Sequence, residues 1–149
     1  MSPKDKELVA IGISVAAGCK PCTDHHVSVA RKARATDDEI RSAIGNALEI
    51  RRRAADIMEF HALAHLGEKR ETRGLDSVGQ GRRVEALTAL GAAYAVNCVT
   101  SLERQLAAAE QSGISREDIS EIVKLAVFIK RKAASHVGRL VGMSEEQAA

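Results

Sequence analysis

Aromatic residues are almost missing from this chain: its 149 residues include two Phe, one Tyr and no Trp. A core without large rings has to be filled by Ala, Leu, Ile and Val, which favours close-packed helices over a β-sandwich or a barrel. Aromatic platforms for stacking single-stranded nucleic acid are missing as well, and 22 basic residues nearly balance 20 acidic ones. We therefore expect an all-α fold that does not bind nucleic acid.

Long apolar runs are also missing. No run approaches the roughly 20 residues of a membrane-spanning helix, and no signal-peptide core follows the charged stretch Met1 to Lys6. We predict a cytoplasmic protein, without membrane interaction, whose residues 1–149 form one domain. Three Cys in such a chain exclude a structural disulfide framework. A small domain with so few large side chains is expected to bury further surface against a partner subunit.

Helix start signals divide the chain. The two prolines, Pro3 and Pro21, stand where a missing backbone N–H costs nothing, at the first position of a helix. A hydroxyl residue followed three positions later by an acid predicts a capped helix start at three places: Ser2 with Asp5, Thr36 with Glu39, and Ser115 with Asp118. Apolar residues recur at helical spacing after Thr36 and after Ser115, no segment alternates like a strand, and the glycine-rich stretch Gly67 to Gly81 indicates a connecting loop.

The chain contains an internal repeat at an offset of 79 residues, without gaps. Each half, about 3–66 and 80–141, is predicted to be a three-helix unit, and the two units can bury their apolar faces against each other. The expected helices are Pro3 to Ala17, Pro21 to Lys32, Asp37 to Leu66, Gln80 to Val96, Val99 to Gln111 and Arg116 to Val141.

The repeat separates scaffold from chemistry. Residues that the halves share are mostly apolar or small, whereas the first half alone carries a set of reactive groups. Its Glu7, Cys22, His25 and His26 correspond to Ala86, Ser101, Arg104 and Gln105. A scaffold that needed these groups for packing would show them twice, so the first-half set is interpreted as functional.

Cys19 and Cys22 form a C-x-x-C motif at the start of the second expected helix. With His26 they fall within an arc of roughly 60° on one helix face. A helix N-terminus stabilises a thiolate, and His26 can exchange its proton. A second thiol three residues away can resolve a sulfenic acid, although ideal helix geometry holds the two Cβ atoms about 5 to 6 Å apart, so the first turn is expected to distort.

The spacing of Glu7, Cys19-Lys20-Pro21-Cys22 and His26, followed by Ala30 and Asp38-Glu39-Ile40, resembles the alkylhydroperoxidase D-like branch of the carboxymuconolactone decarboxylase superfamily, over about Lys4 to Ala55. The resemblance implies an all-helical, alkylhydroperoxidase D-like fold in trimers or hexamers. It also implies thiol peroxidase or disulfide reductase activity, with Cys19 and Cys22 as the redox pair, His26 as the base and Glu7 orienting His26. The implied partners are an organic hydroperoxide and an external dithiol donor, such as a lipoylated or thioredoxin-like protein.

The sequence departs from that branch at two positions: Pro21 stands where a His or an aromatic is frequent, and Arg34 replaces the Gly that commonly ends the cysteine-bearing helix. Two alternatives stay open. The first is a lactone decarboxylase or hydrolase that uses Glu7 and His26 without the cysteines. The second is a zinc-binding or redox-sensing oligomer, in which a zinc ion would recruit His25, His26 or Cys98.

We expect no cofactor and no metal, because zinc requires about four ligands and a second C-x-x-C is missing. His61 and His65 are interpreted as surface or pocket-lining residues, and Cys98 as a core residue or a relic of the repeat. The runs Arg51-Arg52-Arg53 and Lys130-Arg131-Lys132 recur at one repeat position, which favours a shared structural or interface role over an anion site.

Overall fold

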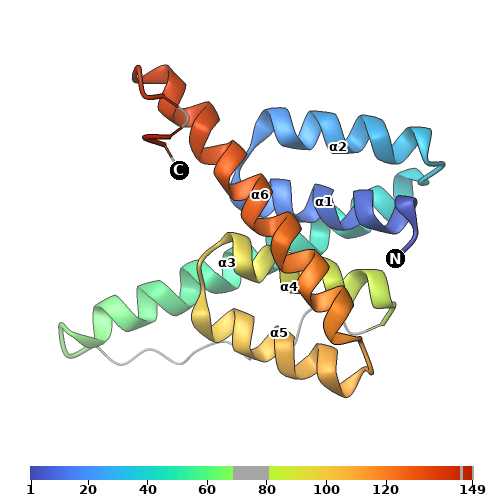
Figure 1. Ribbon diagram of the computed structural model, residues 1–149. Helices are drawn as coiled ribbons and strands as arrows, with labels where there is room; N and C mark the ends of the chain where they lie inside the picture. The colour runs from blue at the N-terminus through green and yellow to red at the C-terminus, as the bar shows by residue number, and fades with distance from the viewer. Residues whose placement is uncertain (69–80, 145, 149) are drawn as a thin grey trace.

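The computed structural model (Figure 1) describes residues 1–68, 81–144 and 146–148, and this part of the chain forms six α-helices and no strand. They are α1 (Pro3–Ala17), α2 (Lys20–Lys32), α3 (Asp37–Ala64), α4 (Arg83–Ala95), α5 (Val99–Gln111) and α6 (Arg116–Leu140). The prediction of an all-α fold with six helices is confirmed.

The observed helix ends differ from the predicted ones by a few residues. The second helix begins at Lys20 rather than Pro21, because Cys19 supplies the cap one residue earlier than expected. The third helix ends at Ala64, the fourth at Ala95 and the sixth at Leu140. The fourth helix begins at Arg83, because Arg82 is its N-cap, so the predicted helix over Gly81 and Arg82 is wrong. Gln80 itself, and most of the loop predicted over 67–81, lie outside the described residues.

All three predicted helix caps are present. The Ser2 hydroxyl accepts the N–H of Asp5, Thr36 accepts that of Glu39, and Ser115 accepts that of Asp118, at 3.1 to 3.2 Å. At α3 the Glu39 carboxylate also accepts the Thr36 N–H, which closes a capping box. Each cap satisfies N–H groups that have no partner within their own helix.

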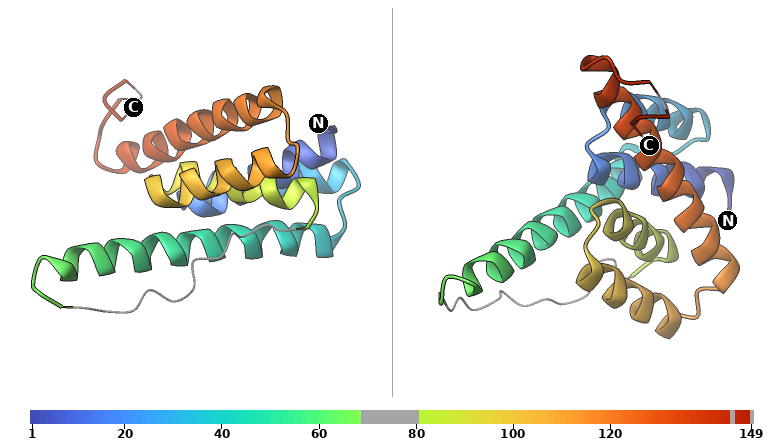
Figure 2. Two further views of the ribbon diagram at one scale, coloured as in Figure 1. Left: turned by 90° about the horizontal axis from the view of Figure 1, so that it is seen from below. Right: turned by 60° about the vertical axis from the view of Figure 1, so that its left-hand side comes forward.

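The helices α1 and α4 lie at the centre of the molecule, packed against each other, and α3 and α6 cover them from opposite sides (Figure 2). The two central helices approach closely at Gly12 and Gly91, which are equivalent positions in the repeat. A Cβ at Gly91 would lie 2.7 Å from Cγ1 of Ile13, so a larger residue does not fit there. The core around this contact is built from Leu, Ile, Val and Ala, as the composition predicted.

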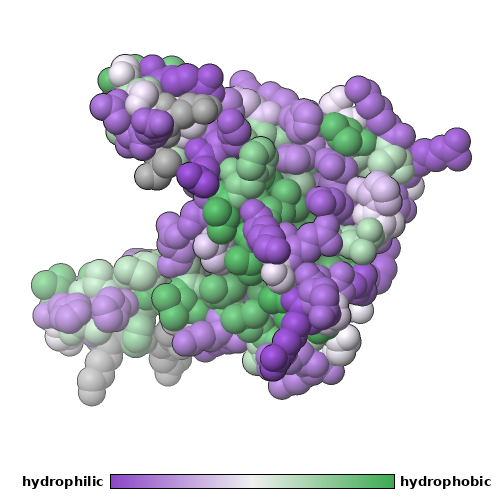
Figure 3. All heavy atoms as spheres, viewed as in Figure 1, coloured by the Kyte–Doolittle hydropathy of each residue, from purple (hydrophilic) through white to green (hydrophobic). Residues whose placement is uncertain are grey.

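The ends of α3 and α6 project from this body and leave hydrophobic side chains uncovered. The last buried residue of α3 is Ala54, ten residues before the helix ends. Hydrophobic residues gather in the hollow between the projecting end of α3 and the C-terminal end of α6 (Figure 3). Exposed hydrophobic residues of these two helices and of the segments that follow them include Met58, Leu66, Phe128, Val137, Leu140 and Val141. Within the described residues, no helix has the length and the apolar character to span a membrane.

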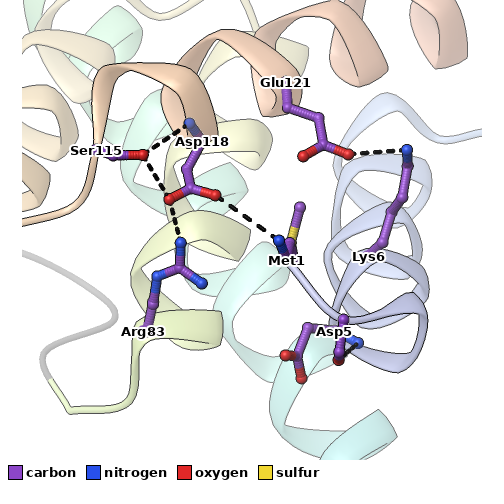
Figure 4. A network of polar contacts seen from close by, with 8 residues as sticks. Met1, Asp5, Lys6, Arg83, Ser115, Asp118 and Glu121 are labelled. Atoms are coloured by element: carbon purple, nitrogen blue, oxygen red, sulfur yellow. Dashed lines mark hydrogen bonds and ion pairs between the residues drawn. The ribbon is translucent and has the colours of Figure 1, made fainter.

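Polar contacts follow the repeat as well. Lys4 of α1 binds Glu39 of α3, and the equivalent Arg83 of α4 binds Asp118 of α6, which also lies 4.0 Å from the amino group of Met1 (Figure 4). A second pair of contacts joins the two halves. Lys6 of α1 forms an ion pair with Glu121 of α6. At the equivalent positions, the Ser42 hydroxyl of α3 donates to the Glu85 carboxylate of α4 at 3.2 Å.

The two basic runs cap the central helices. One Arg51 nitrogen donates to the carbonyls of Val15 and Ala16 at the end of α1. The equivalent Lys130 donates to the carbonyl of Tyr94 at the end of α4, at 3.3 Å. A cation at a helix C-terminus satisfies free carbonyls and opposes the helix dipole. The structural role expected for these runs is therefore confirmed for their first residues.

Candidate redox site

Cys19 and Cys22 form a disulfide at the start of α2, with their Cα atoms 5.3 Å apart. Cys19 is not in the first turn, as the sequence had suggested, but is the N-cap of α2, with extended backbone angles (φ −91°, ψ 96°). The expected distortion of the helix is therefore unnecessary, because the turn before the helix brings the sulfur of Cys19 to that of Cys22. Both residues are buried.

The backbone around Cys19 favours a negative charge on its sulfur. The N–H of Cys22 donates to the Cys19 sulfur at 3.2 Å, which is the position a capping oxygen would take. Gly18 precedes it in the left-handed region (φ 70°) and lets the chain turn between α1 and α2. After reduction, the free N–H groups and the dipole of α2 would stabilise a thiolate at this position.

Glu7 and His26 meet across α1 and α2, with 2.8 Å between the Glu7 carboxylate and Nδ1 of His26. Their side chains are 20% and 12% exposed, so the contact is shielded from solvent. A carboxylate only accepts hydrogen bonds, and Nδ1 of His26 therefore carries a proton. In the neutral ring Nε2 is then free to accept one, and His26 lies one helical turn after Cys22.

A second histidine, His136 of α6, also faces the cysteine pair. One of its ring nitrogens and the two sulfurs lie within 4.8 Å of one another. Among the described residues, this is the one group of three or more His, Cys, Asp or Glu side chains that is close enough together to hold a metal ion. The sulfurs would first have to leave the disulfide, and the set provides three of the about four ligands of a structural zinc site. His136 was not predicted from the sequence. The repeat contained a signal for it, since the equivalent residue of the first half is the apolar Ile57.

The remaining candidates lie apart from the disulfide or lack its chemistry. His25 is exposed and touches His26 edge to face, with ring centroids 5.0 Å apart. His61 and His65 form a similar exposed pair near the end of α3. Cys98 is buried with a free thiol, as expected for a core residue, and it is the N-cap of α5.

A cavity of about 540 Å³ lies beside the junction of α1 and α2, between the C-terminal ends of α1 and α4 and the last turns of α6. Its walls are mainly small and aliphatic side chains, among them Ala133, Val137 and Val141, and Gly18 lines it directly before Cys19. The charged group at its edge is Lys130. The cavity therefore suits a mostly apolar molecule.

Comparison with known proteins finds one family. Residues 1–65, which contain α1, α2 and α3, match the Carboxymuconolactone decarboxylase family. No curated protein and no solved structure matches the chain significantly.

Proposed function

We propose that this chain, whose residues 1–65 match the Carboxymuconolactone decarboxylase family, is a thiol-dependent peroxidase of the alkylhydroperoxidase D-like type that reduces organic hydroperoxides. The observation that carries the proposal is the disulfide between Cys19 and Cys22, one helical turn from the hydrogen-bonded pair of Glu7 and His26. A dithiol pair beside a proton relay is the set of groups that this reaction requires.

The reaction starts from the reduced pair. His26 accepts the proton of one thiol through Nε2, while Glu7 holds the ring by Nδ1. The thiolate attacks one oxygen of the hydroperoxide, the O–O bond breaks, and an alcohol leaves after taking a proton. The sulfur becomes a sulfenic acid. The second thiol displaces water from it, and the disulfide between Cys19 and Cys22 forms.

An external dithiol restores the pair by two exchange steps and is itself oxidised to a disulfide. A lipoylated or thioredoxin-like protein has the required chemistry, and such donors are kept reduced in the cytoplasm, where we place the protein. The aliphatic cavity beside Gly18 supports hydroperoxides with an apolar body as the substrate class. The reaction needs no cofactor and no metal.

We also propose that the protein works as a homo-oligomer, a trimer or a hexamer. The support is the uncovered apolar surface of α3 and α6, which includes Met58 at 57% and Val137 at 65% exposure. Monomers rarely leave a contiguous surface of this kind open. Light scattering on the purified chain measures its mass, and Met58→Glu with Val137→Glu is expected to give monomers. A wild-type chain that is monomeric contradicts this part of the proposal.

The test of the function counts thiols. Wild-type protein and Cys22→Ser are reduced, treated with one equivalent of an organic hydroperoxide and titrated for free thiols, with metal content measured alongside. We expect the wild type alone to lose two thiols per chain, and to regain them with a dithiol. No loss in either protein contradicts the proposal. Lactone turnover that survives replacement of both cysteines would favour decarboxylase chemistry instead.

A further inference from the structure

His136 lies beside the cysteine pair, and the mechanism above gives it no role. It reaches the site from α6, in the other half of the repeat, and its ring is partly buried. The equivalent residue of the first half, Ile57, has no polar group. Like Glu7 and His26, His136 therefore occurs in one half of the repeat only, which distinguishes it from the residues that form the shared scaffold.

The neighbours of His136 determine where its proton lies. The guanidinium of Arg139, one turn further along α6, lies 2.6 Å from Nδ1 of His136. A guanidinium only donates, so Nδ1 accepts, and the proton of the neutral ring is on Nε2. His26 has the opposite arrangement, because its Nδ1 donates to Glu7. One histidine of the site thus presents a free acceptor, and the other presents a free donor.

We propose that His136 is a positioning residue of the redox site, which donates a hydrogen bond to the thiolate released when the disulfide opens. This inference rests on the proposed function. A thiolate of the external dithiol attacks one sulfur, the S–S bond breaks, and its electron pair stays on the other sulfur. The second thiol of the donor then displaces the first sulfur, so the donor leaves as a disulfide and both protein sulfurs are reduced.

The sulfur prepared for the charge is that of Cys19, which already accepts the N–H of Cys22. His136 adds a donor from a second helix, and hydrogen bonds to charged groups are stronger than those between neutral groups. Stabilising the thiolate stabilises the reduced pair, which makes the disulfide easier to reduce. The first half would thus supply the base for taking a proton, and the second half the donor that holds the charge.

The experiment compares His136→Leu, which removes the donor, with His136→Gln, whose amide N–H replaces it. The dithiol–disulfide equilibrium is measured in glutathione redox buffers, and the thiolate population is followed by the rate of alkylation of the reduced protein. We expect His136→Leu to shift the equilibrium about tenfold toward the disulfide, which corresponds to a potential about 30 mV more negative. For His136→Gln we expect an equilibrium constant within about twofold of the wild-type value, since the amide N–H can still donate a hydrogen bond to the thiolate.

His25→Leu is the matched control, because it removes an exposed histidine that is not one of the side chains grouped around the two sulfurs, and it is expected to change neither quantity. Arg139→Met removes the hydrogen bond to Nδ1 of His136. We expect it to shift the dithiol–disulfide equilibrium about threefold toward the disulfide, a shift between those of His136→Gln and His136→Leu. Folding of every variant is checked by thermal unfolding. The inference is overturned if His136→Leu keeps the wild-type potential and alkylation rate, or if His136→Gln shifts them equally. A wild type without a reversible disulfide would instead overturn the proposed function.

Discussion

Residues 18–22, at the junction of α1 and α2, and residues 97–101, at the junction of α4 and α5, follow nearly the same backbone path. Cys19 and Cys98 are both N-caps, with φ of −91° and −94° and ψ of 96° and 104°. The residues before them, Gly18 and Asn97, both have positive φ, 70° and 58°. The two junctions differ in their side chains. The frame that places a cysteine at a helix N-terminus is therefore common to both halves and does not by itself make a redox pair.

The chemistry of the first junction depends on groups that the second junction replaces. Ser101 stands in the place of Cys22, Ala86 in that of Glu7, and buried Gln105 in that of His26. The second half contributes in another way, because α6 packs against α2 and brings His136 to the disulfide. Duplication thus supplied both a repeated core and a second element from which the site can be completed.

The largest effect is expected from Cys22→Ser, which gives the first junction the serine of the second. Turnover of an organic hydroperoxide with a dithiol donor is expected to stop, because a sulfenic acid at Cys19 has no resolving thiol. Peroxide consumption in a coupled assay measures it. Cys98→Ser serves as the control and is expected to keep wild-type turnover, and equal losses in both variants would remove the distinction between the junctions.

The reverse change, Ser101→Cys, gives the second junction a C-x-x-C. Since the backbone angles match, a disulfide with Cys98 is expected to form under oxidising conditions and to appear in a peptide map. With Cys22→Ser in the same chain, peroxide turnover is expected to stay about 100-fold or more below the wild type, because Ala86 and Gln105 supply no proton relay. Turnover near the wild-type rate would show that the relay is dispensable.

Glu7→Gln keeps the size of the side chain and removes the carboxylate that holds His26. We expect the rate of hydroperoxide reduction to fall about 100-fold, because an amide is uncharged and can donate to Nδ1 as well as accept from it, so it no longer fixes the proton there. Stopped-flow measurement of thiol oxidation resolves this step. His25→Gln is a suitable control, since His25 is exposed next to the relay, and a rate for Glu7→Gln within about threefold of the wild type would contradict the assignment.

The shared frame is tested at the contact between α1 and α4. Gly91→Ala places a methyl group 2.7 Å from Cγ1 and 2.8 Å from Cδ1 of Ile13, and is expected to lower the free energy of unfolding by about 1–3 kcal/mol. Gly45→Ala is the matched control on the exposed face of α3, where a Cβ meets nothing within 4 Å. It is expected to raise that free energy by about 0.5–1 kcal/mol, and urea unfolding measures both.

The smallest expected effect is on the pH dependence of stability, through Asp118 of α6, which binds Arg83 of α4. A hydrogen bond from Ser115 and the guanidinium of Arg83 hold the pKa of its carboxyl below the ordinary value. A carboxyl with a lowered pKa in the folded state stabilises the fold above its unfolded value, about 3.9, and this contribution is lost as the pH falls further. Asp118→Asn is expected to remove this part of the acid dependence, about 1 kcal/mol or less. Unfolding curves between pH 2 and 7 in both proteins test it, and identical pH dependence would contradict it.

The helix starts were predictable from local signals in the sequence. Ser2, Thr36 and Ser115 cap the helices they were predicted to start, because a cap depends on residues within one turn. The end of α2 could be located less directly, since Arg34 adopts positive φ (64°) where Gly113 stands in the other half. The position of Cys19 as N-cap was missed by one residue, because the proline signal at Pro21 allows a start at either of two positions.

The sequence by itself determined the all-α class, the repeat and the candidate set of Glu7, Cys19, Cys22 and His26, since periodicity, caps and motif spacing are properties of neighbouring residues. Tertiary structure decided which groups surround the disulfide. The contact of Glu7 with His26 depends on how α1 crosses α2, and the approach of His136 depends on how α6 packs across the halves. Helix packing sets these distances through side-chain contacts far apart in the chain, which no local pattern records.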